Sequence, residues 1–193
     1  MSKKKTSLFK IIIGLFFFWS GVGIGIYYYT TYTSADHFLE GEHVTYLVIN
    51  DKILDYRNIG RENSDKKKSA ENWINQNPEH NIATWGGVAT QNNEDNQNTH
   101  FIGHNPGVFR DLTSLRLNDV ISVYDNINDM RNYIVSEIAM IDDEGNLINQ
   151  ENVNIYEKIV GAGNEERITL QACLSDVTNI VVIAKADAEI ERK

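Results

Sequence analysis

The stretch Arg167-Ile168-Thr169-Leu170-Gln171-Ala172-Cys173 carries the only cysteine of a 193-residue chain, at the end of a run in which apolar residues alternate with others. This alternation is typical of a β-strand with one buried face. A single cysteine cannot form an internal disulfide, so its thiol is either a small apolar core group or a reactive one. The choice depends on whether another part of the chain brings an acid–base group to Cys173.

The best candidate for such a group is His104, in segment 99–107 with the sequence Thr-His-Phe-Ile-Gly-His-Asn-Pro-Gly. A short apolar run ends there on the histidine, beside turn residues. A free thiol has a pKa of about 8.5, so only a small fraction is thiolate at neutral pH. An imidazolium near Cys173 stabilises the thiolate, and the same ring can protonate a leaving amine as a general acid.

Together these segments give the chain a resemblance to the sortases, the cysteine transpeptidases on the cell surface of Gram-positive bacteria. The resemblance extends over residues 43–186, and its most specific parts are Thr169-Leu170-x-x-Cys173, Gly103-His104 and the strand-like run Ile180–Ala184. It implies that Cys173 and His104 are catalytic. It also implies that they lie on neighbouring strand ends of an eight-stranded β-barrel.

The resemblance further implies a reaction. Cys173 would attack the peptide bond of a C-terminal sorting signal of the Leu-Pro-any-Thr-Gly type in a secreted protein, and a thioacyl intermediate would form. An amine of a cell-wall precursor would resolve the intermediate, without a metal or organic cofactor. The alternative is a sortase-like domain that binds sorting signals or wall peptides without turnover.

One position departs from the family pattern. Sortases carry an arginine just before the last strand, where it donates hydrogen bonds to the scissile carbonyl or the developing oxyanion, and this chain has Asn179 there. An amide donates without charge, and charge-assisted bonds are roughly twice as strong as neutral ones. Asn179 is predicted to act as a neutral oxyanion donor together with the backbone amide that follows Cys173. The competing interpretation is a hairpin-end residue without a catalytic role.

Other residues are candidates for contact with a substrate. An arginine from elsewhere in the chain could replace the missing one, and Arg110 follows His104 closely enough to be the preferred candidate. Trp85, Ile102 and Ala172 are also predicted to touch the substrate. Core packing is the competing interpretation for Trp85 and Ile102.

Short runs of β-branched and aromatic residues recur along the chain and predict strands. A hairpin is expected over residues 44–56, and two further strands over 119–124 and 133–141, joined by a polar turn at 125–129. In residues 81–90, the Trp-Gly-Gly step indicates a strand that bulges or lets another backbone approach closely. Many short strands with one or two short helices predict an all-β closed or nearly closed sheet, and the resemblance to sortases favours a barrel.

Two other segments have distinct patterns. Residues 64–76 have apolar side chains at helical spacing, so a short helix is predicted there. Residues 142–166 are typical of a long connection, which we expect to form a wall of the active site because it ends immediately before the cysteine strand. The acidic and amide residues 92–96 lack EF-hand spacing and are interpreted as a solvated loop, so no metal site is predicted.

The N-terminus predicts a membrane anchor. Lysines at positions 3, 4, 5 and 10 precede an uncharged run from Ile11 to Tyr29. As a helix this run would span ~28 Å, close to the ~30 Å core of a bilayer. Because the lysines lie on one side only, the N-terminus is expected in the cytoplasm and the following domain outside the cell. A cleaved signal peptide is the alternative, with Thr33-Ser34-Ala35 as the cleavage site.

These features divide the chain into expected parts. They are a basic cytoplasmic tail (1–10), a transmembrane anchor (11–32), a stalk (33–42), one catalytic domain (43–187) and a polar tail (188–193). Beyond the first forty residues, which hold four lysines and two acids, 14 basic and 25 acidic side chains give a formal charge of −11. This acidic balance argues against nucleic acid as a partner. The expected partners are the membrane, secreted proteins with sorting signals and a cell-wall amine.

Overall fold

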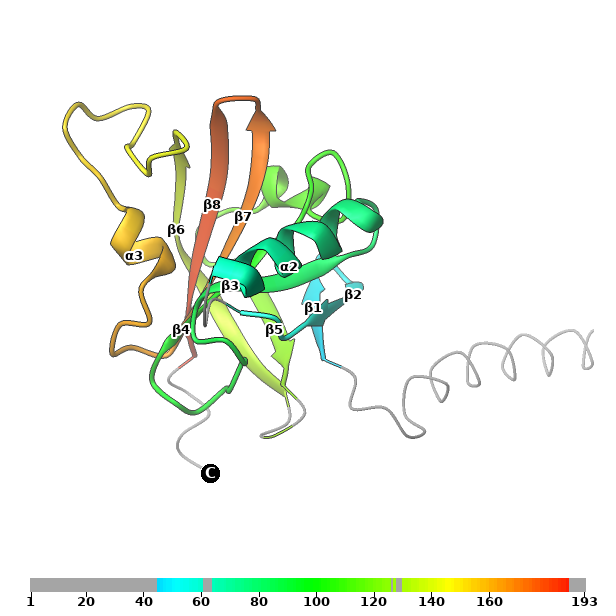
Figure 1. Cartoon of the computed structure of the whole chain (residues 1–193). Helices are drawn as coiled ribbons and strands as arrows, with labels where there is room; N and C mark the ends of the chain where they lie inside the picture. Colours follow the sequence, from blue (N-terminus) through cyan, green and yellow to red (C-terminus); the bar gives the residue numbers. More distant parts are fainter. Residues whose placement is uncertain (1–44, 61–63, 126, 128–129, 188–193) are drawn as a thin grey trace, which may run out of the picture. The chain divides into compact units, whose positions relative to one another are not determined.

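The computed structural model describes residues 45–60, 64–125, 127 and 130–187. The strands of this part are β1 (Tyr46–Ile49), β2 (Lys52–Arg57), β3 (Ile82–Gly87), β4 (Asn98–Ile102), β5 (Val120–Tyr124), β6 (Met130–Ile141), β7 (Arg167–Ser175) and β8 (Thr178–Ala186). In the described residues they form a closed eight-stranded barrel in the order β1-β2-β3-β4-β7-β8-β6-β5 (Figure 1). The predicted barrel, including the hairpin of β1 and β2, is confirmed.

The predicted anchor at residues 11–32 lies outside the described residues. Within the part of the chain that the structure describes, no helix has both the length and the apolar character needed to span a membrane.

The alternating pattern of β7 fills the barrel. Ile168, Leu170 and Ala172 are buried and belong to the main core, which also contains Phe101 of β4 and Tyr133 of β6. Full burial of a large apolar side chain contributes about 1.5–3 kcal/mol to stability. The core therefore fixes which face of β7 points inward, and the intervening residues Gln171 and Cys173 are left for the outer face.

The Trp-Gly-Gly step of β3 has the predicted irregularity. The register between β3 and β4 shifts between Thr84 and Gly86. Gly87 has a φ of +70°, and a Cβ atom on it would lie 1.9 Å from the carbonyl oxygen of Asn98. Only glycine permits this close approach of the two backbones.

Helix α2 (Ser64–Gln76) matches the predicted helix and lies over β3 (Figure 1). Its apolar residues Ala70 and Ile74 pack against Ala83 of β3 in a small separate core, with Trp73 at the edge. The helix covers the outer face of the barrel beside β3 and β4. It thereby builds one wall of the groove described below.

The connection between β6 and β7 builds the opposite wall. It contains the short helix α3 (Tyr156–Val160), a single turn that the sequence pattern did not indicate. Ile159 and Val160 of α3 pack with Ile141, Val181 and Ile183 in a further apolar cluster on the outer face of β8. A further helical turn, the 3-10 helix η1 (Arg110–Ser114), follows the His104 segment.

Candidate active site

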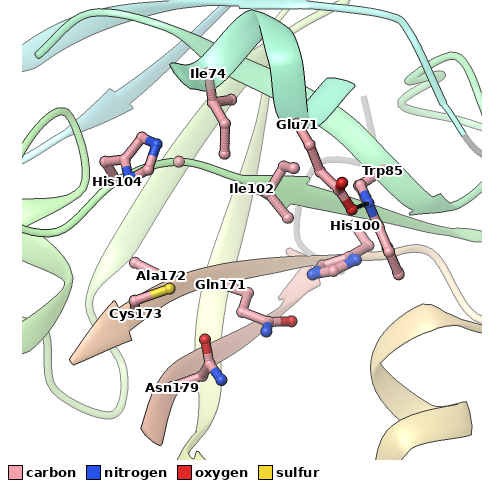
Figure 2. A pocket seen from close by; sticks show the side chains of 11 residues that line it. Glu71, Ile74, Trp85, His100, Ile102, His104, Gln171, Ala172, Cys173 and Asn179 are labelled. Carbon is pink, nitrogen blue, oxygen red and sulfur yellow. Dashed lines mark hydrogen bonds between the residues drawn. The ribbon is translucent and has the colours of Figure 1, made fainter. Parts of the chain in front are cut away.

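Strand pairing brings His104, Cys173 and Asn179 to one level of the barrel. β4 and β7 are parallel with Ile102 paired to Gln171 at the end of the ladder, and His104 and Cys173 each follow that pair by two residues. β7 and β8 are antiparallel with Cys173 paired to Asn179. Paired residues on neighbouring strands point their side chains to the same face. The three residues predicted to be catalytic therefore meet at one groove (Figure 2).

The groove contains a cavity of about 220 Å³, named here the cysteine chamber. Figure 2 shows His104 and Cys173 on facing walls of it. The chamber is lined by Glu71 and Ile74 of α2, Trp85 of β3, His100 and Ile102 of β4, Gly103 and His104 after β4, Gln171, Ala172 and Cys173 of β7, and Asn179 of β8.

A second cavity of about 190 Å³ adjoins it, named here the aspartate chamber. The two chambers share Trp85, Gln171 and Asn179 as lining residues. The other lining residues of the aspartate chamber come from the β6–β7 connection and the end of β6, and they are Ile141, Asp143, Gly145, Tyr156, Ile159 and Val160. Among the described residues, the connection thus lines the aspartate chamber and not the cysteine chamber.

The thiol of Cys173 is exposed at the end of β7 and belongs to the one cysteine of the chain. Partial burial raises the pKa of this thiol, and the nearby negative charge of Asp143 raises it further, while a backbone hydrogen bond partly offsets both. Both causes disfavour the thiolate. Cys173 therefore rests as a neutral thiol at neutral pH, and it needs a proton acceptor to become a nucleophile.

His104 is half-buried and is held by the end of α2. Its Nε2 lies 2.8 Å from Oδ1 of Asn75. Because an amide oxygen can only accept, Nε2 carries the hydrogen of this bond, and Nδ1 of the neutral ring is then the nitrogen that can take a proton. The neighbouring Asn105 donates through Nδ2 to the carbonyl oxygen of Cys173 at 3.1 Å, which joins the two segments.

Asn179 is almost fully buried, and its amide is already engaged. Nδ2 donates to Oδ1 of Asp143 at 3.0 Å. Figure 2 shows its carbonyl oxygen on the side of Gln171 and Cys173. Action as an oxyanion donor would require rotation of the terminal amide, a soft torsion for this side chain. Asn179 thus presents to the groove a neutral amide that is bonded to a carboxylate.

The predicted substrate residues divide into two groups. Trp85, Ile102 and Ala172 line the cysteine chamber. Ala172 also belongs to the main core, and its relative exposure is only 2%. Arg110 does not line either chamber: its Nε donates to the carbonyl oxygen of Gly107 at 3.0 Å, and its guanidinium pairs with Glu79. The residues of the described chain that line the two chambers include no arginine or lysine.

Several residues of the groove were not predicted from the sequence. Gln171 could have been found, because it lies two residues before Cys173 and a strand repeats its facing every two residues. Glu71 and Asn75 could have been found only after the orientation of α2 on β3 was known. Asp143 lies in an irregular connection, where no periodicity assigns a direction to a side chain. Among the described residues, no group of His, Cys, Asp and Glu side chains is arranged to hold a metal ion.

Comparison with known proteins agrees with this geometry. The chain matches the family model of the sortase domain over residues 63–187. That range covers more than half of the chain, so this protein belongs to the sortase family, whose members are cysteine transpeptidases. No curated protein sequence matches the chain.

Three solved structures illustrate the shared fold. A sortase D5 transpeptidase of Clostridium perfringens is 17% identical with a TM-score of 0.51, over 75% of this chain and 79% of that one. Sortase A of Listeria monocytogenes is 15% identical with a TM-score of 0.52, over 76% and 88%. Sortase C-1 of Actinomyces oris is 14% identical with a TM-score of 0.53, over 82% and 81%. The structural similarity shows that the fold is shared, but sequence identities this low do not indicate which substrate this chain uses.

Proposed function

We propose that this chain is an active transpeptidase in which Cys173 is the nucleophile and His104 is the acid–base residue. One observation carries the proposal: the exposed thiol of Cys173 and the ring of His104 line the same cavity from the ends of neighbouring strands. A cysteine that served only as a small core group would be buried, as its neighbour Ala172 is.

In the first step, the thiol proton passes to Nδ1 of His104 as the sulfur attacks the carbonyl carbon of the peptide. This avoids a free thiolate, which the partial burial of the Cys173 sulfur and the charge of Asp143 disfavour. The imidazolium then gives its proton to the departing amine nitrogen, and the C–N bond breaks. The products are a Cys173 thioester of the acyl part and a free amino group on the leaving peptide.

In the second step, an acceptor amine attacks the thioester carbonyl. Its proton is taken by His104, the C–S bond breaks, and the sulfur is reprotonated. A new amide bond joins the acyl part to the acceptor. The acyl donor is a C-terminal sorting signal of the Leu-Pro-any-Thr-Gly type in a secreted protein, and the acceptor is a cell-wall amine, as in the family that the chain belongs to.

The negative charge that develops on the carbonyl oxygen needs a hydrogen-bond donor. The backbone amide of Leu174 is one donor, and Asn179 is the second after its amide has turned from Asp143 toward Cys173. The loss of one such donor typically slows a reaction by about a hundredfold to a thousandfold. A neutral amide in place of the family arginine is consistent with a slower or more specialised enzyme.

Transfer between two defined molecules tests the proposal. A fluorescent sorting-signal peptide is incubated with the domain (residues 43–187) and an excess of triglycine, and the products are separated and weighed. We expect a ligated product from the wild type and none from Cys173→Ala or His104→Gln. Hydrolysis or ligation that persists in Cys173→Ala would refute the role of the thiol.

A binding domain without turnover is the second candidate, and the chambers without arginine or lysine together with the raised pKa of Cys173 favour it. The two functions differ in one measurement. An active enzyme forms a thioacyl adduct with a sorting signal. A binding domain retains the peptide without an adduct, although Cys173 still reacts with iodoacetamide.

We also propose that residues 11–32 anchor the protein as a single-pass segment of the cell membrane, with the N-terminus in the cytoplasm and the catalytic domain outside. The support is the uncharged run between Ile11 and Tyr29 and the lysines that precede it. Protease added to intact cells should remove the domain, whereas full protection until lysis would contradict this topology.

A further inference from the structure

The two chambers have an acidic character. Among the described residues that line them, the carboxylates are Glu71 in the cysteine chamber and Asp143 in the aspartate chamber, and there is no arginine or lysine. Both carboxylates accept a hydrogen bond from a neutral group, Glu71 from the indole of Trp85 at 3.1 Å and Asp143 from Asn179 at 3.0 Å. Apart from His100 and His104 in the cysteine chamber, the described lining of the two chambers therefore offers no basic side chain to balance these carboxylates.

The aspartate chamber also has aromatic walls. Trp85 and Tyr156 both line it and are partly buried against the cluster formed by α3 and the outer face of β8. Aromatic faces attract cations through the negative charge density above the ring, and the attraction adds to that of a carboxylate. Asp143 uses one oxygen, Oδ1, for Asn179, so within the described residues its Oδ2 remains available to a ligand.

We propose that the aspartate chamber binds a positively charged group of the substrate, an ammonium or a guanidinium, between Asp143, Trp85 and Tyr156. The inference rests on the proposed transpeptidase function, because the chamber shares Trp85, Gln171 and Asn179 with the cavity that holds Cys173. A group bound there belongs to a molecule whose reacting bond lies at Cys173. The inference assigns a charge to the substrate, which the family membership does not.

The charge can come from either of the two molecules that react. One source is a lysine or arginine side chain of the sorting signal. The other is a second amino group on the acceptor, separate from the amine that attacks the thioester. Both are ammonium or guanidinium groups and both match the chamber, so the experiment is divided into a donor arm and an acceptor arm.

The donor arm measures single-turnover acylation of Cys173 without any acceptor. Peptides of the Leu-Pro-any-Thr-Gly pattern carry lysine, norleucine or glutamate at each position in turn. Lysine and norleucine have side chains of similar length and differ in charge. If the signal supplies the charge, lysine is favoured about tenfold over norleucine at one position, the effect of a single hydrogen bond to a charged group.

The acceptor arm measures resolution of a preformed thioacyl enzyme by 1,5-diaminopentane or pentylamine. These amines share one reacting end, and only the first carries a distal ammonium. If the acceptor supplies the charge, 1,5-diaminopentane is favoured by a similar factor of about ten. Because Asp143 is exposed to solvent, the preference in either arm should weaken as salt is added.

Variants assign the preference to one carboxylate. Asp143→Asn keeps an oxygen for the amide of Asn179 and removes the charge, so the ratio of lysine to norleucine, or of diamine to monoamine, should fall toward one. Asp143→Lys should invert the donor preference toward glutamate. Glu151→Gln is the matched control, because it removes one charge from the same β6–β7 connection without touching either chamber, and its ratio should stay that of the wild type.

The outcomes separate this inference from the proposed catalysis. Equal rates within every peptide set and for the two amines, or a preference that survives in Asp143→Asn, would overturn the cation site while acylation still proceeds. If no peptide acylates Cys173, the same peptides are titrated into Cys173→Ala by calorimetry. Tighter binding of a lysine peptide that is lost in Asp143→Asn would support the site without catalysis, and equal binding of the lysine and norleucine peptides would overturn the site as well.

Discussion

The two ends of β7 carry polar residues in opposite settings. At the amino end, Glu166 precedes the strand and belongs to a buried set of side chains, the Tyr133 network, formed by Gln91, Asn93, Tyr133 and Glu166. At the carboxyl end, Cys173 opens into the cysteine chamber, and its thiol is exposed. The same strand therefore has a buried polar cluster, the Tyr133 network, at one end and a solvent-exposed site at the other.

In the Tyr133 network the members bond to one another. The hydroxyl of Tyr133 lies 2.7 Å from Oε1 of Glu166 and 3.0 Å from Oδ1 of Asn93, and it accepts from Nε2 of Gln91 at 3.1 Å. Oε2 of Glu166 accepts from the backbone amide of Asn96 at 2.9 Å. Burial raises the pKa of Glu166, and the bonds from Tyr133 and Asn96 oppose that shift.

The groove has a different organisation. His104 is bonded to Asn75, and Asn179 to Asp143, but each partner lies outside the set of residues that would react. Donors and acceptors therefore remain for a substrate. The contrast between the Tyr133 network and the groove shows that similar sets of polar residues can serve either the stability of the fold or the binding of a substrate. Buried polar groups stabilise a fold when they satisfy one another, and unsatisfied capacity beside a cavity is a property of a binding site.

Removal of the Asn179 side chain should give the largest effect. We expect Asn179→Ala to slow thioacyl formation by about a hundredfold to a thousandfold, the range typical of a lost oxyanion donor. Single-turnover acylation of wild type and variant with one peptide measures it. Asn132→Ala provides a control, since it also removes a hydrogen-bonded amide, the partner of Ser122 on β5, away from the groove. Equal rates for wild type and Asn179→Ala would show that Asn179 is a bystander.

A change in the Tyr133 network should lower the stability of the fold and leave the acylation rate unchanged. Tyr133→Phe leaves a buried carboxylate without its hydroxyl partner, so the free energy of unfolding should fall by about 1–3 kcal/mol. Urea denaturation measures this loss, and the acylation rate of the folded variant should remain that of the wild type. Tyr124→Phe removes the hydroxyl of a half-buried tyrosine elsewhere on the barrel and should cost less. A lower acylation rate in Tyr133→Phe would contradict the view that the Tyr133 network serves stability and the groove at the other end of β7 serves catalysis.

The smallest effect should come from the charge of Asp143 on the thiol. Because that negative charge raises the pKa of Cys173, Asp143→Asn should lower it and increase the thiolate fraction at a given pH below the pKa. Iodoacetamide alkylation followed against pH reports the shift, with the half-maximal rate moving to lower pH. In Glu151→Gln the profile should stay in place. A profile for Asp143→Asn that stays in place or moves to higher pH would contradict the electrostatic account.

The sequence predicted the parts of the molecule that repeat. Residues 64–76 form the expected helix, and residues 167–173 lie in the expected strand, which continues to Ser175. Apolar periodicity predicted both because it records which face is buried. The family resemblance predicted that His104 and Cys173 lie on neighbouring strand ends. The parallel pairing of β4 and β7, which ends at Ile102 and Gln171, explains why they do. These features depend on short-range patterns or on motifs that the chain retains.

The parts that escaped prediction depend on irregular backbone. The direction of Arg110 toward Glu79 is decided by turns after His104, where no period assigns a face. The approach of Asp143 to Asn179 depends on how the β6–β7 connection folds over β8. Contacts of this kind join residues far apart in sequence through loops, and composition alone carries no information on them.

The intact mass of the domain after incubation with a sorting-signal peptide tests the central claim most directly. The account predicts that the mass of the wild type increases by that of the acyl fragment, and that tryptic mapping places the adduct on Cys173. Cys173→Ala should show no increase. The account would be contradicted if the wild type gave no adduct with any sorting-signal peptide while iodoacetamide still modified Cys173.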